Sequence, residues 1–193
     1  TQNVQDTSNM LDNLLQWSKS QMQGIRPKHE KANLGLLVND IIFFYRNQAE
    51  KKAITVRTFI SEPSSTFADV EMMKLVVRNL LANAIKFTPT GGMINVEIKS
   101  TLQNVIVSIK DSGLGISENN KQRLFSNTSF STAGTQDEKG TGLGLLLCRD
   151  FVEKNNGKIW VESQLGKGSI FSFSLPLILD PDAVKAPIRS KFI

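Results

Sequence analysis

The sequence predicts a fold of the mixed α/β class, because helix-like and strand-like patterns alternate along the chain. Apolar residues recur every three or four positions, the spacing of one buried helical face, at 34–52, 70–87 and 145–154. Strand-like stretches lie at 54–60, 66–68, 93–102, 105–110, 157–163 and 169–175, and a short helix is expected at 117–125. Two connections are short, at 102–104 and around Gly166 and Gly168, so we expect two antiparallel hairpins.

Composition narrows the possible functions. The chain has 193 residues, enough for one ordinary domain and an extra element, and its net charge of +5 is modest. Lysine and arginine do not cluster, so nucleic acid is not an expected partner, whereas a polyphosphate ligand suits a mild positive balance. The single cysteine, Cys148, excludes an intrachain disulfide framework, and its apolar helical surroundings favour a buried structural thiol. No apolar run is long enough to span a membrane.

The two ends of the sequence are expected to lie outside the main domain. Residues 1–24 carry apolar residues at heptad-like spacing, such as Leu11 and Leu15, and predict a bundle helix that packs on a partner helix. Residues 179–193 have no periodicity and are expected to form a tail or linker, which leaves 25–178 as the domain. Since the sequence begins with Thr1, we expect a fragment of a longer protein. His29, the only histidine, is expected to be an exposed linker residue.

The helix at 70–87 carries two faces of different chemistry. Asp69 can cap its start, and Pro89 cannot continue it. Beside the apolar face, Asn79, Asn83 and Lys86 form a second stripe at i, i+4 and i+7. An ordinary solvated face is the alternative explanation. Such faces usually carry good helix formers, however, and asparagine is a poor one, so the stripe suggests an external ligand if glycine loops follow. Amide oxygens suit Mg²⁺, and lysine suits phosphate.

Two glycine motifs follow the central helix. The first, Asp-Ser-Gly-Leu-Gly-Ile at 111–116, ends a strand. Its glycines could let the backbone approach a ligand closely, and a tight turn explains them equally well. The Asp111 carboxylate, however, can accept from the amino group of adenine and would repel guanine. The second, Gly-Thr-Gly-Leu-Gly-Leu at 140–145, opens a helix and can present amide groups to an anion. Helix–loop packing is the alternative explanation. The unpatterned stretch 126–139 between them is either a lid or an insertion.

In this order, the three motifs resemble those of the ATP-binding domain of sensor histidine kinases, a fold shared with gyrase, MutL-type repair proteins and a heat-shock chaperone. The resemblance covers about residues 30–178, with an N box at 79–88, a G1 box at 111–116 and a G2 box at 140–145. It implies an α/β two-layer sandwich, the Bergerat fold, with a mixed, mostly antiparallel sheet, helices on one face and one preceding bundle helix.

The resemblance also implies a site for ATP and Mg²⁺. It assigns Asn83 to Mg²⁺, Lys86 to the phosphates and Asp111 to the adenine amino group. The other residues it assigns to the nucleotide are Asn79, Phe87, Gly113, Gly115, Ile116, Phe125, Gly140, Thr141, Gly142, Leu143 and Gly144. Asn79 and Lys86 are the expected catalytic residues. Hydrolysing relatives carry a glutamate where this chain has Asn79, and an amide is too weak a base to activate water, which favours a kinase over an ATPase clamp.

Two departures from the family pattern shape the functional hypothesis. Phe125 and Phe130 are five residues apart, whereas the family's F box has two phenylalanines three apart. The H box is absent, so we expect the acceptor histidine before Thr1 and no autophosphorylation by this chain alone. The implied function is γ-phosphoryl donation to a bundle histidine and then to the receiver domain of a response regulator. A non-transferring nucleotide-sensing or dimerisation module and an anti-sigma-type serine kinase are the alternatives.

The same resemblance carries expectations about assembly and location. The parent protein is expected to form a homodimer through bundle helices and to lie at the inner membrane of a bacterium. The present chain would be its soluble, cytoplasmic part.

Overall fold

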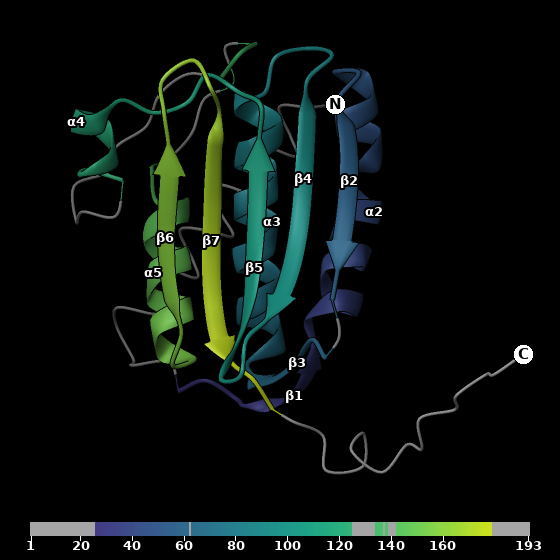
Figure 1. Cartoon of the computed structure of the whole chain (residues 1–193), viewed down its shortest axis with the longest axis vertical. Helices are drawn as coiled ribbons and strands as arrows, with labels where there is room; N and C mark the ends of the chain where they lie inside the picture. Colours follow the sequence, from purple (N-terminus) through teal and green to yellow (C-terminus); the bar gives the residue numbers. More distant parts are fainter. Residues whose placement is uncertain (1–25, 62, 125–133, 137, 139–141, 179–193) are drawn as a thin grey trace, which may run out of the picture.

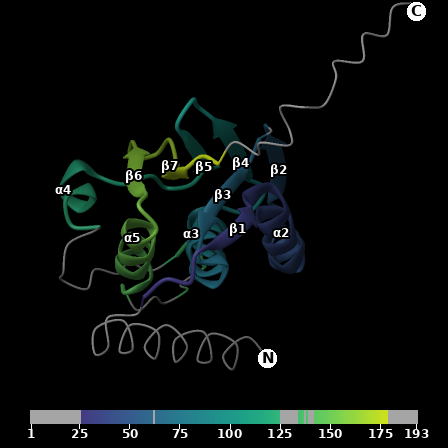
Figure 2. The ribbon, with the colours of Figure 1, turned by 90° about the horizontal axis from the view of Figure 1, so that it is seen from below.

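The computed structural model describes residues 26–61, 63–124, 134–136, 138 and 142–178. These residues form a five-stranded sheet with helices on one face, and none of the described helices covers the opposite face of the sheet (Figures 1 and 2). The predicted bundle helix, the tail and the site residues Phe125, Gly140 and Thr141 lie outside the described residues. Among the helices that are described, none has the length and apolar character needed to cross a membrane.

Three long helices form the second layer. They are α2 (Leu34–Lys51), α3 (Val70–Phe87) and α5 (Gly144–Lys154). The short helix α4 (Glu118–Lys121) lies beyond the edge of the sheet next to β6 (Figure 1). The three helices predicted at 34–52, 70–87 and 145–154 are thereby confirmed, with ends that differ by at most one residue. The stretch predicted at 117–125 holds a single short turn of helix.

The sheet runs in the order β2-β4-β5-β7-β6. Its strands are β2 (Thr55–Ile60), β4 (Met93–Ser100), β5 (Asn104–Asp111), β6 (Lys158–Ser163) and β7 (Ser169–Pro176). β2 pairs with β4 in parallel, and all other neighbours in this sheet are antiparallel. Both predicted hairpins, β4–β5 and β6–β7, are therefore confirmed, as is the mixed, mostly antiparallel sheet.

Helix α3 lies between α2 and α5 and packs against the sheet (Figure 2). The Asp69 carboxylate accepts from the Met72 amide at 3.0 Å, which caps the helix as predicted. The buried face is wider than one stripe, because the sheet and the two neighbouring helices, α2 and α5, all pack against α3. It consists of Met72, Met73, Val76, Val77, Leu80, Leu81, Ala84 and Ile85. Phe87, the last residue of the helix, is only half-buried and contributes to a cavity described below.

A second, two-stranded sheet corrects the expectation that His29 is an exposed linker residue. β1 (Glu30–Asn33) pairs antiparallel with β3 (Ser65–Ala68), and the Lys28 amide donates to Asp69 Oδ2 at 2.8 Å. His29 is half-buried, not exposed, because its ring lies against Phe67 at a centroid distance of 6.3 Å. Its buried Nε2 has no hydrogen-bond partner within the described part of the chain.

Candidate functional site

A cavity of about 250 Å³ lies between α3, the turn after β5 and the turn that joins β6 to β7. Its size is below the roughly 300–1,000 Å³ of complete small-molecule sites, so it suits one part of a larger ligand. Most lining side chains are apolar, and Asp111 is the only ionisable one among the described residues that line it. The lining residues are Asn83, Phe87, Asp111, Leu114, Gly115, Ile116, Ser117, Asn120, Leu124, Leu145, Leu165, Ser169 and Phe171.

Asp111 is the last residue of β5 and is 4% exposed. The amide groups of Gly113 and Ser169 both donate to its Oδ1, at 2.8 and 3.2 Å. Burial raises the pKa of the Asp111 carboxyl, and these amide hydrogen bonds partly oppose the rise. The carboxylate is thus held in one orientation as a strong acceptor within an apolar cavity.

The turn after Asp111 is held between two other segments of backbone. The Leu114 amide donates to Phe87 O at 3.2 Å, and the Gly166 amide donates to Leu114 O at 2.7 Å. A Cβ atom on Gly113 would overlap Phe87 O, and one on Gly115 would overlap Gln164 O. The glycines of the predicted G1 motif therefore allow the turn to contact both the end of α3 and the β6–β7 turn.

A serine hydroxyl ties the same turn to the β6–β7 hairpin. Ser163 Oγ accepts from the Ile116 amide at 2.9 Å and lies 2.9 Å from both Gly168 O and Ser169 Oγ. Ile116 also lines the cavity. This hydroxyl therefore connects one wall of the cavity to the strand that carries Ser169.

The predicted polar stripe of α3 faces the site, and its three residues have different surroundings. Asn83 lines the cavity, and its amide oxygen is a suitable ligand for Mg²⁺. Asn79 Nδ2 donates to Leu75 O at 3.0 Å, and Asn79 Oδ1 would lie 2.7 Å from a Cβ on Gly144. No described group of three or more His, Cys, Asp or Glu side chains forms a metal site.

Lys86, the third residue of this stripe, is half-buried. Burial lowers the pKa of Lys86, and the charge of Glu138 acts in the opposite direction. Its ammonium lies 4.8 Å from the centroid of the Phe87 ring, within the range of a cation–π contact. The lysine is thus placed next to the cavity that Phe87 lines.

The described part of the G2 motif, residues 142–145, leads into α5, as predicted. Helix α5 begins at Gly144, and Leu143 provides no side-chain cap, so the amide groups of its first turn can face an anion. Gly142 and Leu143 immediately precede it, and Leu145 lines the cavity. The described part of this motif therefore lies beside both Asn79 and the cavity.

Sequence reasoning missed the contribution of β7 to the cavity. Ser169 lies opposite Asp111 in the β5–β7 ladder, and Phe171 follows two residues later on the same face. The β6–β7 hairpin was predictable from local patterns, but the pairing of β7 with β5 is a tertiary contact. The sequence therefore offered no signal that Ser169 would contact Asp111.

Comparisons with known proteins agree with this geometry. Residues 68–179 match the family described as histidine kinase-, DNA gyrase B-, and HSP90-like ATPase. The chain is 38% identical over 170 residues to the adaptive-response sensory kinase SasA of Rippkaea orientalis, which covers 87% of this chain and 43% of that protein. It is 36% identical to SasA of Gloeothece citriformis, again with 43% of the relative covered. The chain thus spans less than half the length of these relatives.

The chain is also similar to solved structures of histidine kinases. The nucleotide-free catalytic domain of histidine kinase ThkA is 32% identical, with a TM-score of 0.68, and covers 77% of this chain and 95% of that one. ThkA in complex with the response regulator protein TrrA is 25% identical, with a TM-score of 0.74, and covers 90% of this chain and 48% of that one.

The fold and the site define an ATP-binding α/β domain. The chain belongs to the family of histidine kinase-, DNA gyrase B- and HSP90-like ATPases, as the catalytic domain of a sensor histidine kinase. The family and the fold class expected from the three motifs are therefore confirmed. The roles of individual site residues stay predictions.

Proposed function

We propose that the described cavity binds the adenine base of ATP and that the domain donates the γ-phosphoryl group to a histidine of the bundle. The observation that carries this proposal is the buried Asp111 carboxylate. Two backbone amides converge on its Oδ1, so Oδ2 can accept from the exocyclic amino group of adenine. Guanine presents an acceptor oxygen at that position, which would leave two acceptors opposed in an apolar cavity.

The phosphates would extend from this cavity along the polar stripe of α3. The Asn83 amide oxygen would hold Mg²⁺ together with phosphate oxygens, an arrangement common for this ion. Bound Mg²⁺ would neutralise charge that develops on the transferred group. Lys86 would contact the phosphates as a point charge, and the amide groups at the start of α5 would add an anion-binding surface. In the transfer, the bond between the γ-phosphorus and the bridging oxygen breaks, and a bond to a histidine nitrogen forms.

The surroundings of Asn79 favour transfer over hydrolysis. Its Nδ2 already donates to Leu75 O, and an amide cannot remove a proton from water. Asn79 would instead position groups near the start of α5. The acceptor histidine lies outside residues 25–178 in this proposal, since His29 directly precedes β1 and its ring lies against Phe67 of β3. Phe125, Gly140 and Thr141 would complete the nucleotide site.

A response regulator is the proposed recipient of the phosphoryl group, because the structurally similar ThkA forms a complex with the response regulator protein TrrA. We further propose that residues 1–24 belong to the dimerisation and phosphotransfer hairpin and residues 179–193 to a tail. Homodimerisation and attachment of the parent protein to a membrane stay predictions of the family resemblance.

Calorimetric titration with non-hydrolysable ATP and GTP analogues, with and without Mg²⁺, tests the proposal. We expect Mg²⁺-dependent binding of the ATP analogue only, loss of the Mg²⁺ dependence in Asn83→Ala, and about 10- to 100-fold weaker binding in Asp111→Ala. Asn47→Ala, an exposed change on α2, serves as the control. Absence of ATP-analogue binding to the folded wild type, or equal binding of both analogues, would contradict the proposal.

A second experiment tests phosphoryl transfer. A bundle helix that contains an acceptor histidine is supplied in trans with radiolabelled ATP. We expect a phosphate on that histidine that is labile to acid and stable to alkali. The same label on His29 of the chain alone would show that the acceptor has been placed wrongly.

A further inference from the structure

Strand β2 forms one edge of the five-stranded sheet and leaves half of its backbone polar groups unpaired (Figure 1). The amide of Thr55, its first residue, donates to Gly92 O at 3.0 Å, next to the parallel ladder with β4. Because the peptide groups of a strand alternate in direction, those of Val56, Thr58 and Ile60 point away from the sheet. Their N–H and C=O groups have no hydrogen-bond partner among the described residues.

The β2 edge lacks the features that usually protect an exposed strand. Natural sheets use a proline, a bulge, charged side chains or a covering element for this purpose. β2 has no proline, pairs with β4 in one unbroken register, and carries a single charge, that of Arg57. At the opposite edge, by contrast, α4 lies beyond β6, and β6 contains both Lys158 and Glu162 (Figure 1). Within the described chain, β2 is therefore the edge that is open to another strand.

Helix α2 covers β2 on the helical side of the sheet and exposes apolar side chains at the same end of the molecule (Figure 2). Leu36, Phe43 and Phe44 are 66%, 76% and 68% exposed, and their i, i+7 and i+8 spacing places them on one side of the helix. No other helix in the described part of the chain exposes a large apolar side chain. Since the solvent side of a helix is ordinarily polar, this side of α2 is suited to contact with another chain.

A single extended segment fits this edge better than a second copy of the domain. Neighbouring strands lie about 5 Å apart, whereas packed helices need about 8–10 Å between their axes. Two copies paired through β2 would each bring an α2 helix under adjacent strands, and the two helices would collide. A segment without a helix of its own avoids this collision.

The open face of β2 indicates the charge of such a segment. Val56 and Ile60 pack against the core, so Arg57 and Phe59 project from the opposite, helix-free face. Arg57 is exposed and has no ion-pair or hydrogen-bond partner among the described residues. Opposite charges on neighbouring strands attract, so an acidic side chain beside Arg57 would complement this edge.

We propose that the β2 edge binds an extended segment of another protein, which adds to the sheet as a further strand. Its backbone pairs with the free N–H and C=O groups of Val56, Thr58 and Ile60. Its alternate side chains are apolar on the face toward α2 and acidic on the face beside Arg57. None of these residues lines the cavity assigned to adenine, so the inference stands apart from the proposed function.

A short peptide of alternating glutamate and valine, long enough to pair with all of β2, is the probe. Its matched control is a peptide of the same length with lysine in place of glutamate. NMR titration of the isotope-labelled full chain should show binding of the glutamate peptide and slower hydrogen exchange of the Val56, Thr58 and Ile60 amides. Absence of binding, or protection confined to other amides, would overturn the proposal.

The charge preference is tested with the same two peptides. The lysine peptide should bind the wild type about threefold more weakly than the glutamate peptide, and Arg57→Glu should reverse this order. A preference that does not change in Arg57→Glu would show that the edge does not select an acidic segment.

The backbone pairing is tested at Thr58. Thr58→Pro removes an N–H group that points away from β4, a place where an edge strand tolerates proline. We expect about tenfold weaker binding of the glutamate peptide, whereas Thr58→Val keeps the N–H group and should bind like the wild type. Thermal unfolding shows whether both variants are folded. Equal affinities of the two folded variants would refute the pairing.

Methylation of the peptide gives a test that does not depend on the folding of Thr58→Pro. Methyl groups on the amides of all valines, or of all glutamates, block one side of the added strand. Only one set of amides faces β2, so one methylated peptide should lose binding and the other should keep it. Binding by both, or by neither, would overturn the proposal. Self-association of the wild type that Thr58→Pro abolishes, measured by analytical ultracentrifugation, would assign the edge to a second copy and also overturn it.

Discussion

Two glycines in the β6–β7 turn allow a matched test of how the hairpin holds Asp111. Gly166 and Gly168 have φ angles of +77° and +85°, so an alanine at either position is forced into the left-handed region. A Cβ on Gly166 meets no atom within 4 Å. A Cβ on Gly168 would overlap Asp111 O and lie 2.9 Å from Asp111 C and 3.1 Å from Gly113 N. The variants Gly166→Ala and Gly168→Ala thus differ in contact and not in backbone conformation.

The two substitutions should differ in stability. The left-handed conformation costs an alanine about 1–2 kcal/mol, which is the whole effect expected for Gly166→Ala. Gly168→Ala adds overpacking against fixed backbone, which costs about 1–3 kcal/mol, so its total is about 2–5 kcal/mol. Each kcal/mol lowers the Tm of a domain of this size by about 2–4 °C. We therefore expect the Tm of Gly168→Ala to lie several degrees below that of Gly166→Ala.

The same overlap should weaken nucleotide binding. Relief of the contact would move the backbone of Asp111 and the Gly113 amide, which orients the Asp111 carboxylate, and the proposed hydrogen bond to adenine would be lost or weakened. We expect about 10- to 100-fold weaker binding of the ATP analogue by Gly168→Ala, and an unchanged affinity for Gly166→Ala. Calorimetry and thermal unfolding measure both effects. Equal affinities and equal Tm values for the two variants would show that the hairpin does not position Asp111.

Three further predictions concern buried polar groups. Asp111→Asn removes a carboxyl group whose pKa is raised above 3.8 by burial, so the wild type loses stability as the pH rises from 3.8 through that raised pKa. The stability of the variant relative to the wild type should therefore increase over this pH range. A pH-independent difference between the two in chemical unfolding would contradict the reasoning. Asn155→Ala removes the acceptor of the Asp69 amide at 2.7 Å and should lower the free energy of unfolding by about 1–3 kcal/mol, whereas the exposed Asn47→Ala should stay within about 0.5 kcal/mol of the wild type. Cys148 is fully buried and burial raises the pKa of its thiol, so a thiol reagent should modify it only as the protein unfolds; rapid modification of the folded protein would contradict this burial.

The elements that could be predicted from the sequence are those with local causes. Helix α3 begins after the Asp69 cap and ends before Pro89, and both signals lie within the helix or next to it. Strand β1 has no such signal, because only Ala32 among its four residues is buried and its partner β3 lies more than 30 residues away. Its formation depends on a tertiary pairing that no local pattern encodes.

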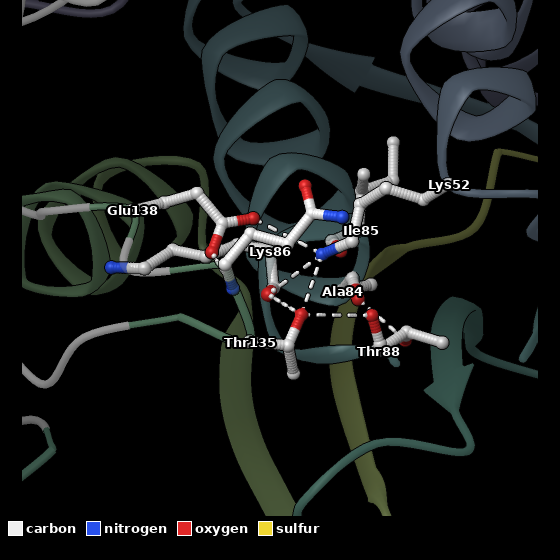
Figure 3. A network of polar contacts seen from close by, with 8 residues as sticks. Lys52, Ala84, Ile85, Lys86, Thr88, Thr135 and Glu138 are labelled. Carbon is white, nitrogen blue, oxygen red and sulfur yellow. Dashed lines mark hydrogen bonds and ion pairs between the residues drawn. The ribbon is translucent and has the colours of Figure 1, made fainter. Parts of the chain in front are cut away.

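The candidate site divides in the same way. The amide and lysine stripe of α3 follows from helical periodicity, and Asp111 was recognisable from its position at a strand end. The burial of Lys52 was not recognisable, because a lysine at the end of a helix is usually solvated, and its neighbour Lys51 is indeed exposed. The burial of Lys52 results from the meeting of the end of α2, the end of α3 and the side chains of Thr135 and Glu138 (Figure 3). Only the three-dimensional structure brings these segments together.

Asn79 shows how packing and chemistry constrain one position. On chemical grounds alone, an amide at this position means that the side chain cannot act as the base that hydrolysis needs. The structure adds that Asn79 Oδ1 lies where α5 begins, so close that a Cβ on Gly144 would be at 2.7 Å, while Nδ2 is held by Leu75 O. A glutamate is one methylene longer and has no donor for Leu75 O, so it would disturb the start of α5. Asn79, which favours transfer over hydrolysis in the proposed function, is therefore also a packing contact between α3 and the start of α5, which follows the proposed phosphate-binding motif.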